Sequence, residues 1–194
     1  MDKKILLVIM DGVGFSKTGI GDAVSEANTP TLDKLLAEKP TVRLKAHGAA
    51  VGLPSDDDMG NSEVGHNALG CGQIYSQGAK LVNESIESGK IFDGNAWKEA
   101  LSGCKDSGSL HFVGLLSDGN VHSNISHLIA MIERAKNDGV KSVKVHALLD
   151  GRDVPPSSAA DYMAEAVAEL DKIGLGKIAT ISGRFYAMDR DNAW

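Results

Sequence analysis

The stretch that decides the fold is LHFVGLLSDGNVHSNISHLIAMIERAKNDGVKSVKVHALLDGRD, residues 110–153. It contains two apolar runs, Leu110–Leu116 and Ser142–Leu149, each of the length and composition of a buried strand. Between them, Ser123 is a candidate N-cap and Asp138-Gly139 a stop signal for a helix. The apolar residues of that helix recur at helical spacing: Ile125, Leu128, Ile129 and Ile132. The stretch therefore predicts a strand–helix–strand unit with two parallel strands.

The rest of the chain continues this alternation. Pro155-Pro156 predict the start of a helix that runs to about Ile173, and Lys177–Ile181 predicts the last strand. Four further elements are expected before residue 75: a buried central strand over Lys3–Met10, a helix over Pro30–Glu38, a strand over Thr41–His47, and a helix from Ser62 to about Leu69. We therefore predict an α/β protein rich in parallel sheet, with helices on the faces of the sheet.

Composition and charge exclude several classes of protein. The chain has 194 residues with 20 Lys and Arg against 26 Asp and Glu, a net charge of −6, so it is a poor candidate for binding nucleic acid. The apolar run Ile5–Met10 is too short to span a membrane or form a signal-peptide core. Cys71 and Cys104 are too few for a disulfide framework. We expect a cytoplasmic protein that binds neither nucleic acid nor membranes.

Charged residues and glycines follow most of the predicted strands. Ligands bind at the carboxyl ends of strands in open parallel sheets, so these segments are candidate site residues. They are Asp11-Gly12, SDGNVH (117–122), DGRD (150–153) and SGR (182–184). Arg152 and Arg184 are two of only five arginines. An arginine side chain can bind a carboxylate or a phosphate with two hydrogen bonds. The pattern favours a site for a small anion, and the alternative is ordinary surface ion pairing.

Spacing alone leaves several residues with two interpretations. Ser62 could be a helix N-cap, or a nucleophile activated by a base or a metal. Asp11 could form an Asp-Gly turn or ligate a divalent ion. His122 could be structural or belong to the site. The three aspartates Asp56–Asp58 lie in a long loop and are expected to be solvated.

Six sequence strings together carry a resemblance to a known family. They are VIMDGVG, NTPTLD, MGNSEVGH, LLSDGNVHS, DGRDVPP and GRFYAMDRD, in this order. Over nearly all of its length the chain resembles the cofactor-independent (2,3-bisphosphoglycerate-independent) phosphoglycerate mutases. The resemblance implies an isomerase that interconverts 3-phosphoglycerate and 2-phosphoglycerate in glycolysis through a phosphoserine intermediate. It also implies an alkaline-phosphatase-like metalloenzyme with two Mn²⁺ ions, replaced by Mg²⁺ or Co²⁺ in some members.

The resemblance assigns roles to the matching positions. Ser62 would be the nucleophile, and Asp11 and Ser62 would be metal ligands. Asp153 is a candidate acid/base for the glycerate hydroxyls. The residues expected to hold the substrate are His122, Arg152, Asp153, Arg184 and Arg190.

The main departure of the chain from the family pattern is its length. The family is more than twice as long, and a later segment supplies most metal ligands in Asp-His and Asp-x-x-x-His arrangements. This chain has no Asp-His pair, and its Asp-x-x-x-His, Asp118 to His122, belongs to the substrate motif. We therefore expect a fragment that is inactive alone: residues 1–75 as the first segment of the metal-binding domain, and 76–194 as an incomplete phosphotransferase domain. The alternatives are a truncated, non-catalytic phosphoglycerate-binding protein and another alkaline-phosphatase-like phosphomutase.

Overall fold

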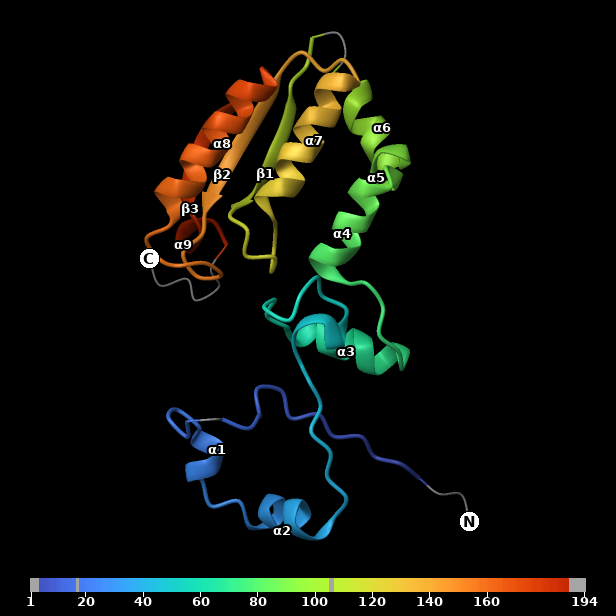
Figure 1. The fold of residues 1–194 in the computed structure, drawn as a ribbon, viewed down its shortest axis with the longest axis vertical. Helices are drawn as coiled ribbons and strands as arrows, with labels where there is room; N and C mark the ends of the chain where they lie inside the picture. The colour runs from blue at the N-terminus through green and yellow to red at the C-terminus, as the bar shows by residue number, and fades with distance from the viewer. Residues whose placement is uncertain (1–3, 17, 105–106, 189–194) are drawn as a thin grey trace. The chain divides into compact units, whose positions relative to one another are not determined.

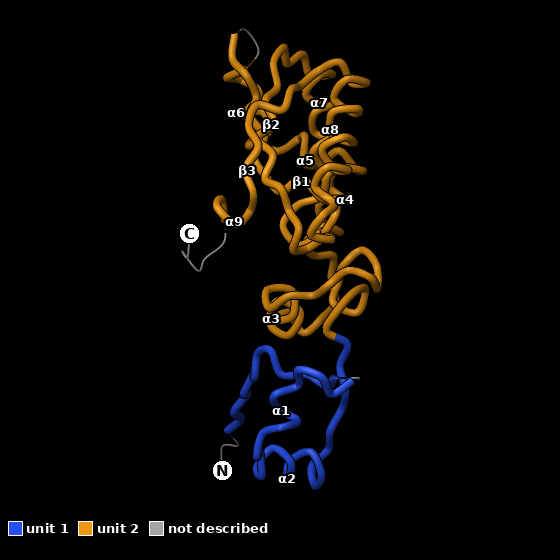
Figure 2. The backbone as a smooth tube through the Cα atoms, turned by 90° about the vertical axis from the view of Figure 1, so that its left-hand side faces the viewer, with its two compact units in different colours: residues 1–45 blue, residues 46–194 orange. Residues whose placement is uncertain are grey.

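The computed structural model describes residues 4–16, 18–104 and 107–188. Its backbone divides into two compact units, Met1–Lys45 and Ala46–Trp194, which Figure 2 shows in blue and orange. The first unit contains two helices, α1 (Ala23–Glu26) and α2 (Pro30–Glu38). The domain boundary expected near residue 75 stays a prediction.

A parallel three-stranded sheet organises the second unit. The strands are β1 (Leu110–Leu116), β2 (Val143–Leu149) and β3 (Lys177–Gly183), in the order β1-β2-β3. The crossovers between them carry α7 (Ile125–Asn137) and α8 (Ala159–Ile173), and Figures 1 and 2 show both helices on the same face of the sheet. The predicted α/β fold with parallel strands is therefore confirmed.

The main core lies between this sheet and its two helices. Ile132 of α7 has no exposed surface, and Val143 and Val145 of β2 are 1% and 2% exposed. Burying such a side chain contributes roughly 1.5–3 kcal/mol, so these contacts fix the positions of the strands and hence of the loops that follow them. Helix α8 begins at Ala159 and not at Pro155, because the residue before a proline is disfavoured in the helical region.

The remaining elements of the second unit precede the sheet in sequence. They are a 3₁₀ turn η1 (Gly48–Val51) and the helices α3 (Ser62–Cys71), α4 (Gly78–Glu87), α5 (Lys90–Asp93) and α6 (Asn95–Ser102); α9 (Arg184–Ala187) follows β3. None of the described helices has the length and hydrophobicity that a membrane span requires.

Residues 75–77 make two close contacts with the segments before them. Gln77 donates from Nε2 to the carbonyls of Val51 and Val64 at 2.9 and 3.2 Å, which ties α3 to η1. Gly52 has φ +86°, and a Cβ placed there would lie 1.8 Å from the Tyr75 carbonyl oxygen. A glycine is therefore required at this point.

Both strands predicted in the first unit are absent. Residues 4–10 and 41–47 have no strand structure, and Ile5 is 94% exposed. A parallel strand satisfies its backbone N–H and C=O groups only through neighbouring strands. The described residues of this unit include no strand that could pair with either segment.

Two predicted helix caps are displaced by one residue. Asn61 caps α3, where its side chain accepts a hydrogen bond from the Val64 amide at 2.9 Å, so Ser62 is the first helical residue and not the N-cap. Asn124, not Ser123, caps α7. The Ser123 hydroxyl instead donates to the Leu115 carbonyl at the end of β1.

Candidate functional site

Three side chains meet where the three strands end. The register aligns Leu116 with Leu149, and Leu149 with Gly183, so the next residues of the three strands are neighbours. These are Ser117, Asp150 and Arg184. Asp150 Oδ2 accepts a hydrogen bond from Ser117 Oγ at 2.7 Å, and Oδ1 accepts one from Arg184 Nη1 at 2.7 Å. One carboxylate therefore joins all three strand ends.

The environment of Asp150 keeps this carboxylate ionised. Its side chain is 1% exposed, and burial alone would raise its pKa. The hydrogen bonds from Ser117, from Arg184 and from the amides of residues 152 and 153 outweigh burial and lower the pKa to about 2. Asp150 therefore carries its charge throughout the neutral range.

Arg184 bridges two carboxylates and is itself buried. Burial opposes its charge, but Nη1 lies 2.7 Å from Asp150 Oδ1 and 2.8 Å from Asp153 Oδ2, and these contacts raise the pKa of the guanidinium. Two N–H groups of the guanidinium are engaged in this way. Arg184 therefore fixes Asp153 in place.

His122 completes the group of predicted residues that the structure brings together. Its Nε2 lies 4.0 Å from Asp153 Oδ2, beyond hydrogen-bonding distance, and about half of its side chain is exposed. The loop that carries His122 packs closely on Asp153, since a Cβ added to Gly119 would lie 2.8 Å from the Asp153 Cβ. His122, Asp153 and Arg184 therefore form one cluster.

Arg152 lies at the edge of this cluster. Its amide donates to Asp150 Oδ1 at 3.1 Å, while the residue as a whole is exposed. On the other side, the Tyr162 hydroxyl donates to Asp118, and this hydrogen bond, with some burial, raises the pKa of the phenol to about 12. Around the cluster, Arg152 and His122 are the exposed groups that can meet an anion.

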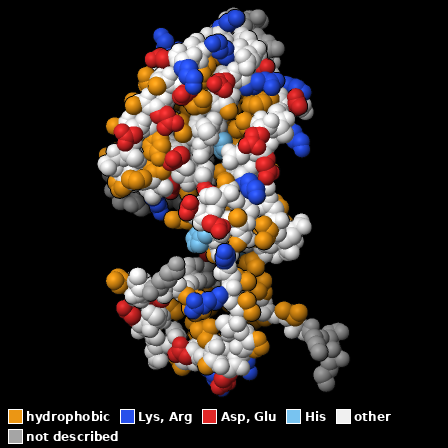
Figure 3. Space-filling view, viewed as in Figure 1, with side chains coloured by type: hydrophobic (Ala, Val, Ile, Leu, Met, Phe, Trp, Pro, Cys, Tyr) orange, Lys and Arg blue, Asp and Glu red, His pale blue; other side chains and the backbone are white. Residues whose placement is uncertain are grey.

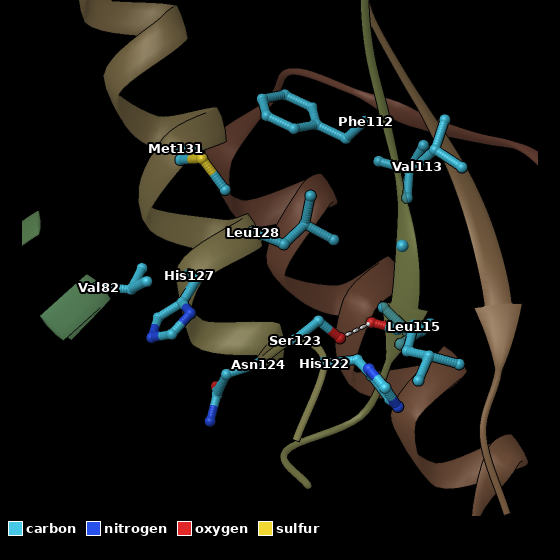
Figure 4. A pocket seen from close by; sticks show the side chains of 13 residues that line it. Val82, Phe112, Val113, Leu115, His122, Ser123, Asn124, His127, Leu128 and Met131 are labelled. Carbon is cyan, nitrogen blue, oxygen red and sulfur yellow. Dashed lines mark hydrogen bonds between the residues drawn. The ribbon is translucent and has the colours of Figure 1, made fainter. Parts of the chain in front are cut away.

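A cavity of about 260 Å³ adjoins the cluster on the side of α7. Figure 4 shows His122, Ser123 and Asn124 at one end of it, with Phe112 and Met131 farther along. Most of its lining is apolar, so it does not suit a charged ligand. His127 also lines it, and burial lowers the pKa of this histidine.

Ser62 lies at the exposed first position of α3. Its Oγ is 3.1 Å from His66 Nδ1, one turn along the helix. That nitrogen is also 2.7 Å from the Ser62 carbonyl oxygen, which can only accept a hydrogen bond, so Nδ1 carries the proton. In this tautomer His66 cannot take a proton from the Ser62 hydroxyl.

Besides Ser62, two further predicted site residues are not placed in the cluster. Asp11 lies in the first unit, in a turn closed by a 3.3 Å hydrogen bond from the Val13 amide to the Met10 carbonyl, with Gly12 at φ +79°. The Asp-Gly turn considered for Asp11 is therefore present, and its role as a metal ligand stays a prediction. Arg190 lies outside the described residues.

The described residues do not assemble a complete metal site. No group of three or more His, Cys, Asp or Glu side chains in residues 4–16, 18–104 and 107–188 could hold a metal ion. Asp11 and Ser62 would supply part of a ligand set at most.

Acidic and basic side chains are interspersed on the helices of the second unit seen in Figure 3.

Sequence reasoning assigned no role to Ser117 or Asp150. Both directly follow a strand, so only their position at a strand end made their segments candidates for the site. Their hydrogen bond depends on the β1–β2 register, which no local pattern specifies. Residue type and position marked Arg152 and Arg184 as candidates, and the resemblance added Asp153.

Comparison with known proteins gives one consistent result. The family model described as the BPG-independent PGAM N-terminus matches residues 82–194. The 2,3-bisphosphoglycerate-independent phosphoglycerate mutase of Clostridioides difficile is 49% identical over 194 residues, which are 100% of this chain and 38% of that protein. A probable enzyme of the same name from Leptospira interrogans is 50% identical, over 98% of this chain and 36% of its own length.

A solved structure agrees with these sequences. It is described as Leishmania mexicana phosphoglycerate mutase at low cobalt concentration, and it matches with a TM-score of 0.81 and 44% identity over 96% of this chain and 35% of that chain. The present chain thus spans little more than a third of the length of its relatives. The chain belongs to the 2,3-bisphosphoglycerate-independent phosphoglycerate mutase family and corresponds to the N-terminal part of its members.

Proposed function

We propose that these residues supply the nucleophile and part of the substrate site of a mutase that interconverts 3-phosphoglycerate and 2-phosphoglycerate without bisphosphoglycerate. The observation that carries the proposal is the cluster at the strand ends, where Asp150 and Arg184 hold Asp153 beside His122. A phosphorylated hydroxy acid needs cationic groups for its two anionic ends and an acid/base for its hydroxyls, and this cluster offers both.

In the proposed reaction Ser62 Oγ accepts the phosphoryl group of 3-phosphoglycerate and returns it to the neighbouring hydroxyl. The cap on α3 supports this role, because Asn61 provides the capping oxygen and the Ser62 hydroxyl is not needed for it. Arg152, His122 and Arg184 retain the glycerate, with Arg190 as a further predicted contact. Asp153, fixed by Arg184, exchanges protons with the glycerate hydroxyls.

The metal belongs to the same proposal. We expect Mn²⁺, or Mg²⁺ or Co²⁺ in its place, with Asp11 and Ser62 among its ligands. A divalent ion would favour the alkoxide of the serine, which His66 cannot produce in the tautomer present here. We expect the reaction in the cytoplasm, with the two phosphoglycerates as small-molecule partners.

A chimera tests the proposal. Residues 1–194 replace the matching part of the Clostridioides difficile relative, of which they cover 38%. We expect the chimera to interconvert the two phosphoglycerates without bisphosphoglycerate, and Ser62→Ala to abolish the reaction. Ser102→Ala, in an exposed serine at the end of α6, is the matched control and should leave the rate unchanged.

The 194 residues alone are expected to show no mutase activity, even with added Mn²⁺. Calorimetry of this chain with 3-phosphoglycerate then separates two alternatives, a non-catalytic phosphoglycerate-binding protein and another alkaline-phosphatase-like phosphomutase. Binding that pentose phosphates do not compete for would favour a phosphoglycerate site, and competition by pentose phosphates would favour another alkaline-phosphatase-like phosphomutase. Turnover by the isolated chain that depends on Ser62 would show that the expected inactivity is wrong.

A further inference from the structure

A hydrogen bond joins the loop before Ser62 to the loop that carries His122. Asn120 Nδ2 donates to Asp58 Oδ1 at 2.6 Å, between residues 62 positions apart. Asp58 precedes Ser62 by four residues, and Asn120 precedes His122 by two. Both partners are half-buried. The contact therefore links the segment of the proposed nucleophile directly to the substrate loop, residues 117–124.

Asn120 has an unusual backbone conformation. With φ +60°, it is the one non-glycine residue with positive φ in the part of the chain that the structure describes. Asparagine tolerates this region better than most residues, yet the conformation still costs of the order of 1 kcal/mol. Its side chain is held at both ends, because Oδ1 accepts a hydrogen bond from Asn124 Nδ2 at 2.7 Å and Asn124 caps α7. Asn120 therefore connects Asp58 to the start of α7.

Asp58 is itself fixed in place. Its Oδ2 accepts hydrogen bonds from the amide and hydroxyl of Ser55, at 2.7 and 2.8 Å, and its carbonyl accepts one from the Gly48 amide at 3.1 Å. The expectation that all three loop aspartates are solvated is therefore wrong for Asp58, and Asp56 also accepts a bond from the Ala49 amide. Asp56 and Asp57 are both exposed, and Asp58 is the half-buried member of the run.

The substrate loop is thus held on two sides. Asp58 holds it through Asn120, and Gly119 packs on Asp153 at its other side. Phosphoryl transfer depends on the relative placement of nucleophile and substrate, and a displacement of 1 Å can cost roughly a hundredfold in rate. We propose that Asp58 is a positioning residue, which acts through Asn120 to fix the loop of His122 relative to the segment of Ser62. This inference rests on the proposed function.

The variants are chosen to separate the link from the turn around it. Asp58→Ala removes the acceptor but also breaks the turn with Ser55. Asn120→Gly removes the hydrogen bonds of this side chain to Asp58 and Asn124, leaves the turn of Ser55 with Asp58 intact, and keeps a residue that adopts positive φ freely. Asp57→Asn is the matched control, one position along the same loop. In the chimera, we expect both Asp58→Ala and Asn120→Gly to lower kcat on the order of tenfold or more, and Asp57→Asn to leave it within about twofold.

Two readouts distinguish positioning from a general loss of structure. The double variant should be no slower than the slower single variant, because both changes break the same link. In a His122→Ala background, Asn120→Gly should cost no further activity, whereas a merely structural defect would lower the rate again. In the 194-residue chain, hydrogen exchange of the amides of residues 119–122 should quicken in both variants, with β2 amides unchanged.

The possible negative results separate the positioning role of Asp58 from the proposed function. If Asn120→Gly and Asp58→Ala match Asp57→Asn in both kcat and exchange, the positioning role is refuted while the proposed function stands. If their effects on kcat add, or persist without His122, the role is also refuted. If the unsubstituted chimera shows no Ser62-dependent activity, the proposed function fails, and hydrogen exchange alone still tests whether Asp58 holds the loop.

Discussion

Replacing Asp150 by asparagine removes the charge that joins the three strand ends while keeping the shape of the side chain. The pKa of this carboxyl is about 2 in the folded protein, against a reference value of 3.8. At 1.36 kcal/mol per pH unit, the ionised carboxylate stabilises the fold by about 2 kcal/mol at pH 7. The substitution should lower the free energy of unfolding by less than the roughly 3–5 kcal/mol that an orphaned buried charge costs, because Arg184 keeps Asp153 as a partner.

The sign of the pH dependence follows from the lowered pKa. A carboxyl whose folded pKa is depressed stabilises the protein fully above its unfolded pKa, and this contribution disappears as the pH falls through the folded value. The difference in free energy of unfolding between the unsubstituted chain and Asp150→Asn should therefore shrink from about 2 kcal/mol at pH 7 to about 1 kcal/mol at pH 3.

Urea unfolding of the 194-residue chain, followed by far-ultraviolet circular dichroism at both pH values, measures this difference. Asp171→Asn, an exposed aspartate near the end of α8, is the control and should change the free energy of unfolding by no more than about 0.5 kcal/mol. If Asp150→Asn is as stable as this control, or if its deficit is the same at pH 3 and pH 7, the reasoning about the carboxylate is refuted.

Further predictions concern turns and side chains around the site. Gly52→Ala should destabilise the chain by about 3 kcal/mol or more in urea unfolding, because a Cβ meets the Tyr75 carbonyl and φ is +86°. A Cβ at Gly103 would meet no atom within 4 Å, so Gly103→Ala should change the free energy of unfolding little. Equal losses of stability in the two variants would contradict this prediction. Ultraviolet titration should show that Tyr162 ionises only near pH 12, and Asp118→Asn should lower the pKa of this phenol toward 10. An unchanged titration would show that Asp118 does not hold Tyr162.

Local sequence patterns predicted the second unit well. The apolar run Leu110–Leu116 is β1 to the residue, and the helical spacing of Ile125 and Ile132 placed α7 correctly. The same kind of pattern failed for residues 4–10. An apolar run reports a tendency to be buried, but a strand also requires a partner for its backbone, and the run itself does not show whether one is present.

The candidate site was predictable in position but not in its internal contacts. The rule that ligands bind at strand ends selected the segments of Arg152 and Arg184, and the resemblance added a role for Asp153. The bond from Ser117 to Asp150, and the bond from Asn120 to Asp58, join segments 33 and 62 residues apart. Such contacts depend on strand register and loop packing, which are set by the whole fold.

The most direct test of the account is the phosphorylation state of Ser62. The chimera would be incubated with 3-phosphoglycerate, quenched in acid, digested, and analysed by mass spectrometry of the peptide that contains residues 59–66. The account predicts the mass of one phosphoryl group on Ser62, which is absent from Ser62→Ala and present in Ser102→Ala. A chimera that interconverts the two phosphoglycerates while Ser62 remains unmodified, or that is phosphorylated at another residue, would contradict the account.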